Sequence, residues 1–302
     1  MNIANRGGIK NLKSLHRKTA TICVFGIIVS LVGAGAATAG SSDPRSLNLS
    51  LLDAAKNGEA ALIESGLLGG ASISTRDRFG NTALIYAARG AHVESARVLI
   101  EAGADPNQAN VNGNTPLFEA AGSGSIELVR FLFQQGADPN RVSMKQVSPL
   151  ANAIFNKHTS IAEFLLQHGA RAEFVDSTGK NAAVYAAANG ETDILRHILD
   201  LNGEHAVALD ARYAHDLTLL MWAAGYGNAD AVELLVSRDA GLDLADDRGK
   251  TALMMAAENG HADVVSFLID SGADADIRDK DGRTARDLSE MAGHSESAQN
   301  LN

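Results

Sequence analysis

Residues 80–107 read GNTALIYAARGAHVESARVLIEAGADPN, and the chain repeats this pattern several times. Residues 113–140 read GNTPLFEAAGSGSIELVRFLFQQGADPN, and residues 249–276 read GKTALMMAAENGHADVVSFLIDSGADAD. The threonine of the pattern, or a Ser or Asn in its place, recurs at Thr82, Thr115, Ser148, Asn181, Thr218, Thr251 and Thr284. The step from Thr82 to Thr115 recurs between all neighbours except Asn181 and Thr218, which lie four positions further apart. A fixed period of this size predicts a stack of repeated units.

Each unit contains the signals of two short helices. The seven recurring residues are N-cap types, whose side-chain oxygens accept hydrogen bonds from the first turn of a helix. Paired alanines such as Ala87-Ala88 follow, and then a second apolar run such as Val98-Leu99-Ile100. Glycines suited to a left-handed position end the second helix in five units: Gly70, Gly103, Gly136, Gly169 and Gly272. Asn202 and Asp239, which tolerate positive φ, occupy this place in two others.

These motifs resemble ankyrin repeats over roughly residues 46–302. The resemblance implies an all-α solenoid of stacked helix-turn-helix units with hairpin fingers on one side. We expect eight repeats, at about 46–76, 77–109, 110–142, 143–175, 176–212, 213–245, 246–278 and, as a polar cap, 279–302. The four extra residues are expected between Asn202 and Thr218. One departure is consistent, because the family's usual Thr-Pro-Leu-His histidine is replaced by Ile85, Phe118, Ala151, Val184, Met221 and Met254.

Residues 1–39 have the composition of a secretory signal peptide. An apolar stretch from Ala20 to Val32 follows five basic residues, and no acidic residue comes before Asp43. Small residues predict cleavage between Ala39 and Gly40, which leaves a linker over 40–45. The alternative is an uncleaved anchor, because residues 20–39 could just span a membrane. The chain's one cysteine, Cys23, lies in the apolar stretch, so the mature chain would have no thiol.

The charge of the mature chain restricts its partners. Without residues 1–39 the Lys and Arg count falls from 26 to 21 against 36 Asp and Glu, a formal net charge of −15. This argues against nucleic acid and anionic lipid surfaces, which attract basic proteins. It favours simple solubility or a protein partner with a basic surface. We expect no stable membrane association after cleavage and a chain that is monomeric alone.

The sequence offers little chemistry. It contains no Gly-x-Ser-x-Gly, His-Glu-x-x-His or phosphate-binding loop, and we expect no catalytic residue, cofactor or metal. His92, His261 and His294 occupy the Gly-His turn of the resembled family and are expected to be structural. An alternative is an exported effector with an enzymatic or metal site in the 200–216 insertion, in which a metal-dependent activity would use His205, Asp210 and His215.

The remaining candidate is a protein-binding face. By register, the finger tips and the exposed ends of the first helices supply Arg78, Phe79, Arg89, Asn112, Met144, Phe155, Tyr213, His215, Tyr226 and Arg248. Aromatic residues and arginine are favoured at binding hot spots. The repeat at 143–175 is the least regular, with Gln146 in place of glycine and Lys157 in place of a small turn residue. Trp222 is expected to pack between helices.

We therefore expect a non-catalytic module that holds another protein on its concave face. The resemblance to exported bacterial ankyrin arrays implies the periplasm of a Gram-negative bacterium. Two roles stay open: an immunity or inhibitor protein that blocks an enzyme, and a helper for a resident enzyme. A membrane-anchored scaffold is a further alternative if the N-terminal segment is kept.

Overall fold

The computed structural model describes residues 43–201, 203 and 206–301. Within these ranges the chain is helical, with sixteen α-helices, no strand, and one isolated bridge between Arg76 and Thr82. No helix in this part of the chain is both long and apolar enough to cross a bilayer. The predicted signal peptide (1–39), its cleavage point between Ala39 and Gly40, and Asn202 and His205 lie outside the described residues.

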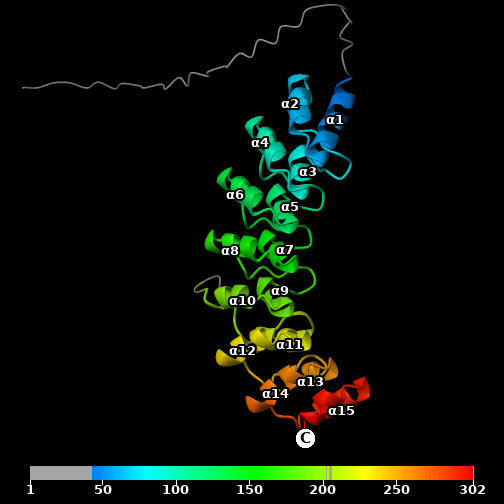
Figure 1. Ribbon diagram of the computed structural model, residues 1–302, viewed down its shortest axis with the longest axis vertical. Helices are drawn as coiled ribbons and strands as arrows, with labels where there is room; N and C mark the ends of the chain where they lie inside the picture. Colours follow the sequence, from blue (N-terminus) through cyan, green and yellow to red (C-terminus); the bar gives the residue numbers. More distant parts are fainter. Residues whose placement is uncertain (1–42, 202, 204–205, 302) are drawn as a thin grey trace, which may run out of the picture. The chain divides into compact units, whose positions relative to one another are not determined.

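Each repeat contributes an inner and an outer helix, and the pairs stack in chain order (Figure 1). The inner helices are α1 (Pro44–Asn57), α3 (Ala83–Arg89), α5 (Pro116–Ser123), α7 (Pro149–Phe155), α9 (Ala182–Asn189), α11 (Leu219–Gly225), α13 (Ala252–Glu258) and α15 (Ala285–Ala292). The outer helices are α2 (Ala60–Leu68), α4 (Val93–Glu101), α6 (Ile126–Gln134), α8 (Thr159–Gln167), α10 (Thr192–Leu199), α12 (Ala229–Ser237), α14 (Ala262–Asp270) and α16 (Ser295–Gln299). The inner helices follow an arc, and its hollow side defines the concave face (Figure 1).

The N-cap prediction is confirmed at all seven positions. The Thr82 hydroxyl accepts a hydrogen bond from the N–H of Ile85 at 3.2 Å. The other six caps bond their third helical residue in the same way. The first helix differs from the expectation of a linker over 40–45. It begins at Pro44, because the Asp43 carboxylate caps it and proline fits the first helical position.

The core runs through the whole stack as one cluster. The paired alanines of the inner helices are buried, as are outer-helix residues such as Leu99, Leu132 and Leu165. The residues at the family's histidine position include core residues, since Ile85 and Val184 are 0% exposed. Because a single helix pair could not bury these side chains, each repeat depends on its neighbours for stability.

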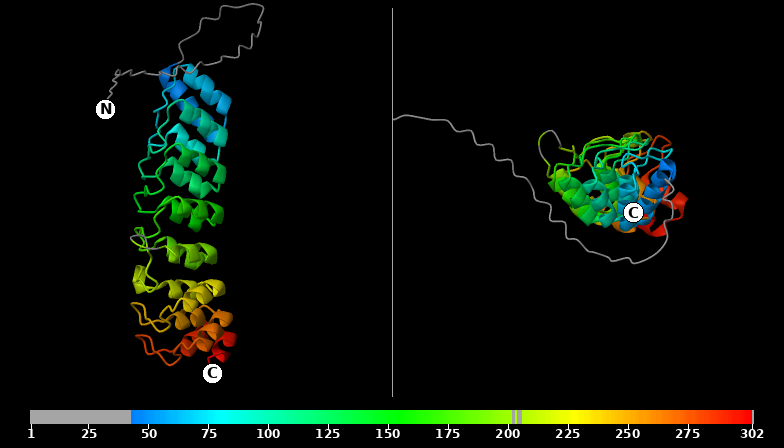
Figure 2. Two further views of the ribbon diagram at one scale, coloured as in Figure 1. Left: turned by 90° about the vertical axis from the view of Figure 1, so that its left-hand side faces the viewer. Right: turned by 90° about the horizontal axis from the view of Figure 1, so that it is seen from above.

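Short hairpin loops, here called fingers, precede the inner helices and line up along one edge of the stack (Figure 2). In the finger of the second repeat the N–H of Asp77 donates to the carbonyl of Asn81 at 3.1 Å. Neighbouring fingers are joined by single backbone bonds, such as that from Val111 N–H to the Phe79 carbonyl at 3.0 Å. The finger of the sixth repeat has the same closure, from Tyr213 to Leu217, so the four extra residues lie before Tyr213.

The left-handed helix ends are confirmed where the chain is described. Gly70, Gly103, Gly136, Gly169 and Gly272 have φ between 82° and 99°. Asp239 has φ 66°, which agrees with its assignment to the same register.

A histidine links the turn of one repeat to the turn before it. The Nε2 of His92 donates to the Lys56 carbonyl at 3.1 Å, and that of His261 donates to the Gly225 carbonyl at 3.2 Å. These bonds confirm the structural role expected for His92 and His261. Each ring covers a left-handed glycine of the preceding repeat. A Cβ on Gly227 would lie 2.4 Å from the His261 Nδ1, so only glycine fits there.

Two repeats have a short or flexible side chain in place of the histidine ring. In both cases the left-handed residue of the preceding repeat, which the ring would cover, is not glycine. Ser125 and Glu191 occupy the histidine position in the third and fifth repeats. The left-handed residues of the repeats before them are Ala91, with φ 58°, and Lys157, with φ 59°.

In the sixth repeat an amide takes the place of the ring. The Asn228 side chain donates to the Ala187 carbonyl at 2.8 Å. The left-handed residue of the preceding repeat, Gly190, is again a glycine. A Cβ on Gly190 would lie 2.9 Å from the Asn228 Oδ1. The turn thus accepts a side chain only where the following repeat does not cover it with a histidine or asparagine. We call this paired choice of residues the turn lock.

Candidate functional site

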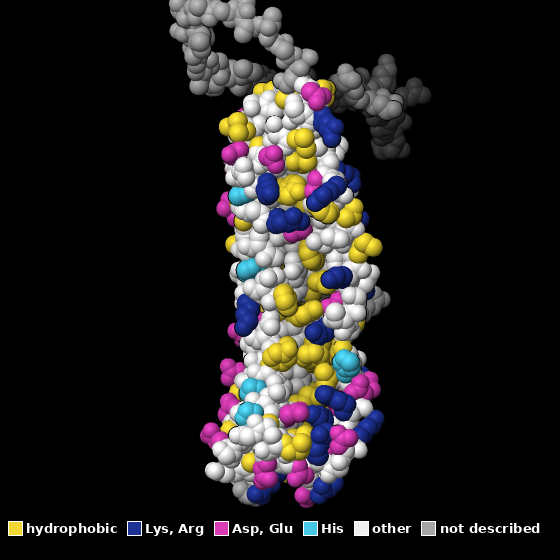
Figure 3. All heavy atoms as spheres, turned by 90° about the vertical axis from the view of Figure 1, so that its right-hand side faces the viewer, with side chains coloured by type: hydrophobic (Ala, Val, Ile, Leu, Met, Phe, Trp, Pro, Cys, Tyr) yellow, Lys and Arg dark blue, Asp and Glu magenta, His cyan; other side chains and the backbone are white. Residues whose placement is uncertain are grey.

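The concave face presents a column of hydrophobic side chains with Lys and Arg beside it (Figure 3). Nine of the ten predicted partner-binding residues are exposed, and Tyr213 is half-buried. The most exposed apolar ones are Met144 at 73%, Phe155 at 61% and Tyr226 at 60%. Asn112 and Met144 lie in adjacent fingers, where the Met144 N–H donates to the Asn112 carbonyl at 2.8 Å.

At the N-terminal end of this face, the fingers present arginine against aromatic rings. The Arg78 guanidinium carbon lies 4.6 Å from the centroid of the Phe79 ring. Both residues line a hollow of about 630 Å³ with Arg45 and Leu49 of α1. Arg89 is less available, because Glu119 pairs with it at 2.8 Å. This ion pair raises the pKa of the Arg89 guanidinium against the opposing effect of burial.

Two tyrosines of the inner helices are fixed by carboxylates at the base of their fingers. The Tyr185 hydroxyl donates to the Asp176 carboxylate at 2.5 Å, and the Tyr86 hydroxyl donates to that of Asp77 at 2.6 Å. Burial, and then the bond to Asp176, raises the pKa of Tyr185 to about 12. Burial alone would raise the pKa of Asp176, but hydrogen bonds from Tyr185, Thr178 and the backbone outweigh it and lower the pKa. Both tyrosine rings are therefore held in one orientation.

The middle of the face carries a continuous aromatic row, defined here as Phe155, Tyr185, Lys180, Trp222 and Tyr226. The Phe155 and Tyr185 rings meet edge to face at 5.8 Å, and the Trp222 and Tyr226 rings stack at 6.2 Å. The Lys180 ammonium lies 5.9 Å from the Tyr185 centroid and 5.0 Å from that of Trp222. The row thus crosses three repeats, 143–175, 176–212 and 213–245.

The sequence prediction does not include three members of this row: Tyr185, Lys180 and Trp222. Trp222 packs partly against the core, but it also lines an open hollow, so it does not lie only between helices as expected. Its position is the fourth after the N-cap, the same register as Tyr86 and Tyr185. That shared register is the sequence signal that could have revealed Tyr86, Tyr185 and Trp222.

The hollow beside Trp222 has a volume of about 370 Å³. Its walls come from α11, α13 and the finger between them and include Met221, Tyr226, Arg248 and Met255. Arg248 is held over the hollow by Asp246, whose carboxylate accepts from its Nη2 at 3.0 Å. The indole Nε1 of Trp222 is buried and has no hydrogen-bond partner within the described chain.

Tyr213 and the longer finger have mainly internal contacts. The Asn181 amide donates to the Tyr213 hydroxyl at 3.1 Å, and burial raises the pKa of this tyrosine. Tyr213 therefore offers less surface to a partner than the register suggested. The Asp210 carboxylate accepts from the Gly241 N–H at 3.0 Å. Asn107 and Asp243 accept the equivalent bond from the next repeat, so the bond to Asp210 is a regular contact between neighbouring repeats.

The metal-binding alternative gains no ligand set in the described part of the chain. His215 Nδ1 lies 3.4 Å from the Asp247 carboxylate, whereas Asp210 bonds the backbone of Gly241. Across residues 43–201, 203 and 206–301 no group of three His, Cys, Asp or Glu side chains is arranged to hold a metal ion. His205, the third proposed ligand, lies outside the described residues.

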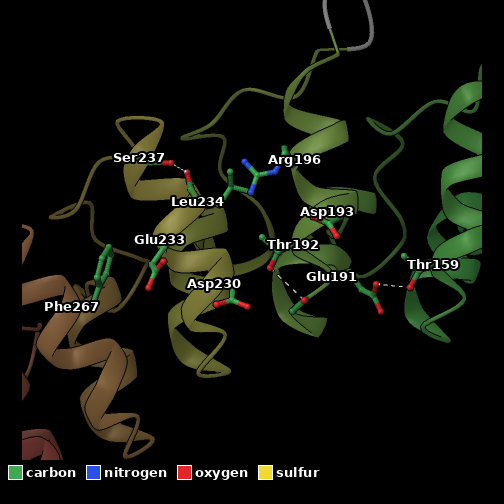
Figure 4. Close-up of a pocket in the computed structure, with 11 residues that line it drawn as sticks. Thr159, Glu191, Thr192, Asp193, Arg196, Asp230, Glu233, Leu234, Ser237 and Phe267 are labelled. Atoms are coloured by element: carbon green, nitrogen blue, oxygen red, sulfur yellow. Dashed lines mark hydrogen bonds between the residues drawn. The ribbon is translucent and has the colours of Figure 1, made fainter.

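A third hollow, of about 860 Å³, lies between the outer helices α10, α12 and α14 (Figure 4). Its walls carry Glu191, Asp193, Asp230, Glu233 and Arg196. Local structure explains three of these carboxylates. Asp193 and Asp230 occupy the first turns of α10 and α12, where acidic residues stabilise the helix, and Glu191 accepts from the Thr159 hydroxyl at 2.8 Å.

The stacked helix pairs define the class of this protein as a helical-repeat solenoid. A family model described as ankyrin repeats (3 copies) matches residues 51–143, 140–210, 194–281 and 220–301. These matches cover most of the chain, which belongs to the ankyrin-repeat family. Ankyrin repeats generally mediate protein–protein interaction and are typically non-catalytic. No curated protein matches the chain.

Proposed function

We propose that this chain is an exported, periplasmic ankyrin protein that binds another protein on its concave face. It acts without catalysis, either by blocking an enzyme as an immunity or inhibitor protein or by assisting a resident enzyme. The observation that carries this proposal is the aromatic row, in which two residues are more than half exposed: Phe155 and Tyr226. Rigid, partly exposed aromatic side chains on one face are what protein interfaces use as anchors.

Export is proposed from the N-terminal sequence alone. Five basic residues, an apolar stretch and small residues before Gly40 have the order of a secretory signal. The intact mass of protein recovered from the periplasm tests this, since cleavage after Ala39 removes a defined segment. A mass that still includes residues 1–39 would favour the membrane-anchored scaffold instead.

The binding role is tested by affinity capture from periplasmic extract, followed by mass spectrometry. The bait is the tagged protein purified from cells that express the full chain. The variant Phe155→Ala with Tyr226→Ala should abolish capture of a stoichiometric partner and leave thermal unfolding nearly unchanged, because both side chains are exposed. The control is Leu62→Ala with Leu68→Ala in α2, which removes exposed apolar surface from an outer helix and should leave capture intact.

Three outcomes would count against the proposal in different ways. Unaltered capture by the double variant would mean that the partner binds elsewhere. Absence of any partner would remove the periplasmic binding role. Stoichiometric zinc in the purified protein would instead favour the exported effector with a metal site near His205, Asp210 and His215.

A further inference from the structure

We propose that the aromatic row is a recognition site for a partner segment that carries apolar side chains flanked by carboxylates. This inference rests on the proposed function, because it assumes that the concave face binds a protein. It adds the place and the chemistry of recognition. The site covers the repeats at 143–175, 176–212 and 213–245, with Lys145, Gln146 and Lys157 at its edge.

The floor of the site is continuous and consists of four aromatic rings bridged by Lys180. Phe155 leads to Tyr185, Tyr185 to Lys180, and Lys180 to Trp222 and Tyr226, through the ring contacts described above. The hollow of about 370 Å³ beside Trp222 continues this floor toward Met255. This volume is at the lower end of ligand sites. It therefore fits one or two side chains of a bound segment.

Three lysines around this floor have no acidic partner among the described residues. Lys145, Lys157 and Lys180 form no ion pair with any described residue, and the contacts of the Lys180 ammonium are ring faces. The carboxylates nearby are already bonded: Asp176 to Tyr185, and Asp246 to Arg248. Asp216, at a finger tip, is the exception. A partner carboxylate would therefore meet free ammonium groups here.

This local charge differs from that of the whole chain, whose formal net charge is −10. The expectation of a basic partner rests on the formal net charge of −15 that the chain would have without residues 1–39. At the concave face, electrostatic complementarity favours an acidic segment instead, because interface specificity depends on the charges that meet.

The backbone of the fourth repeat gives an independent reason to single out its side chains. Gln146 has φ 61° and Lys157 has φ 59°, although most other repeats have glycine at these two positions. Non-glycine residues in this region carry a conformational cost, and such residues cluster at functional sites. Both side chains are exposed, and neither makes a hydrogen bond or ion pair within the described chain. The strained positions therefore gain nothing inside the molecule that would offset their cost.

The chemistry of the partner is tested with a displayed random-peptide library, selected on the protein purified from cells that express the full chain. We expect enrichment of peptides that combine Asp or Glu with Leu, Phe or Trp. A synthetic copy of an enriched peptide without Trp should shift the emission of Trp222, the chain's one tryptophan. Enrichment of Lys- and Arg-rich peptides, or no enrichment, would overturn the proposal.

Glycine substitutions test the role of the fourth repeat. The variants Gln146→Gly and Lys157→Gly should each raise the unfolding temperature and weaken peptide binding, together by about tenfold. Ala91→Gly is the matched control, because Ala91 has the same left-handed backbone in the second repeat, outside the site. It should raise the unfolding temperature and leave the affinity unchanged. Equal affinities of all three variants would refute the assignment.

The outcomes separate this inference from the proposed function. Capture of a periplasmic partner together with selection of basic peptides would leave the binding role intact and overturn only the partner chemistry. Selection of acidic peptides together with empty capture would support the recognition site and contradict the periplasmic role.

Discussion

Replacing Gly227 by alanine should destabilise the protein far more than the same change at Gly272. Both glycines are left-handed, with φ 71° and 94°. A Cβ on Gly272 would meet nothing within 4 Å, so Gly272→Ala costs only backbone strain, about 1–2 kcal/mol. A Cβ on Gly227 would lie within 2.8 Å of three atoms of the His261 ring.

The ring of His261 must therefore move in the Gly227→Ala variant. It then loses its bond to the Gly225 carbonyl, about 1 kcal/mol, and the crowding adds about 1–3 kcal/mol. With the backbone strain, the expected total is about 3–6 kcal/mol, which exceeds the Gly272→Ala loss by at least about 2 kcal/mol. The assay is urea unfolding followed by the emission of Trp222, which lies in the same repeat as Gly227, with free energies compared at equal slope.

A second substitution shows whether the histidine causes the difference. In a His261→Ser background the turn resembles the natural pair of Ala91 and Ser125. The cost of Gly227→Ala should then fall to that of Gly272→Ala. Equal losses for the two single variants, or no relief from His261→Ser, would refute the turn lock.

Three smaller predictions follow from local contacts. Thr115→Ala removes a buried N-cap and should cost about 1 kcal/mol in urea unfolding, whereas an unchanged midpoint would deny the cap a role. Asp176 has a lowered pKa, so its contribution holds above about pH 3.9 and is lost as pH falls through the lowered value. Asp176→Asn should flatten that acid loss, and a profile like the parent's would contradict it. The Tyr185 contribution holds below pH 10 and fades toward its pKa of about 12; Tyr185→Phe should remove this alkaline loss, as the same unfolding assay at high pH would reveal.

The backbone plan of this fold could be predicted from the sequence because each signal acts locally. A Thr or Ser cap bonds an N–H three residues on, and a glycine after an outer helix supplies positive φ, so neither depends on distant residues. The start of α1 at Pro44 could not be predicted in this way. The first repeat has Leu49 at the cap register, and its actual cap, Asp43, lies outside the period.

The candidate site was only partly predictable. Phe155 and Tyr226 stand out in the sequence because no other repeat has an aromatic residue at the same position near the end of an inner helix. Trp222 reads as an interior residue because large apolar side chains are usually buried. Its exposure in the hollow depends on Lys180 of the preceding repeat and on Tyr226, which follows α11. It also depends on ring orientations, which the spacing of residues in the sequence does not predict.

The turn lock gives the repeats a fixed order. A constant period suggests that any unit could be removed without harm to the stack. Removal of the repeat at 143–175 would bring Gly124 beside Glu191, and these two residues would not clash. Removal of the repeat at 110–142 would instead bring the Cβ of Ala91 under the imidazole of His158, where only glycine fits. Units of equal length are thus not exchangeable, and a recombination event that respects the period can still produce a chain that stacks badly.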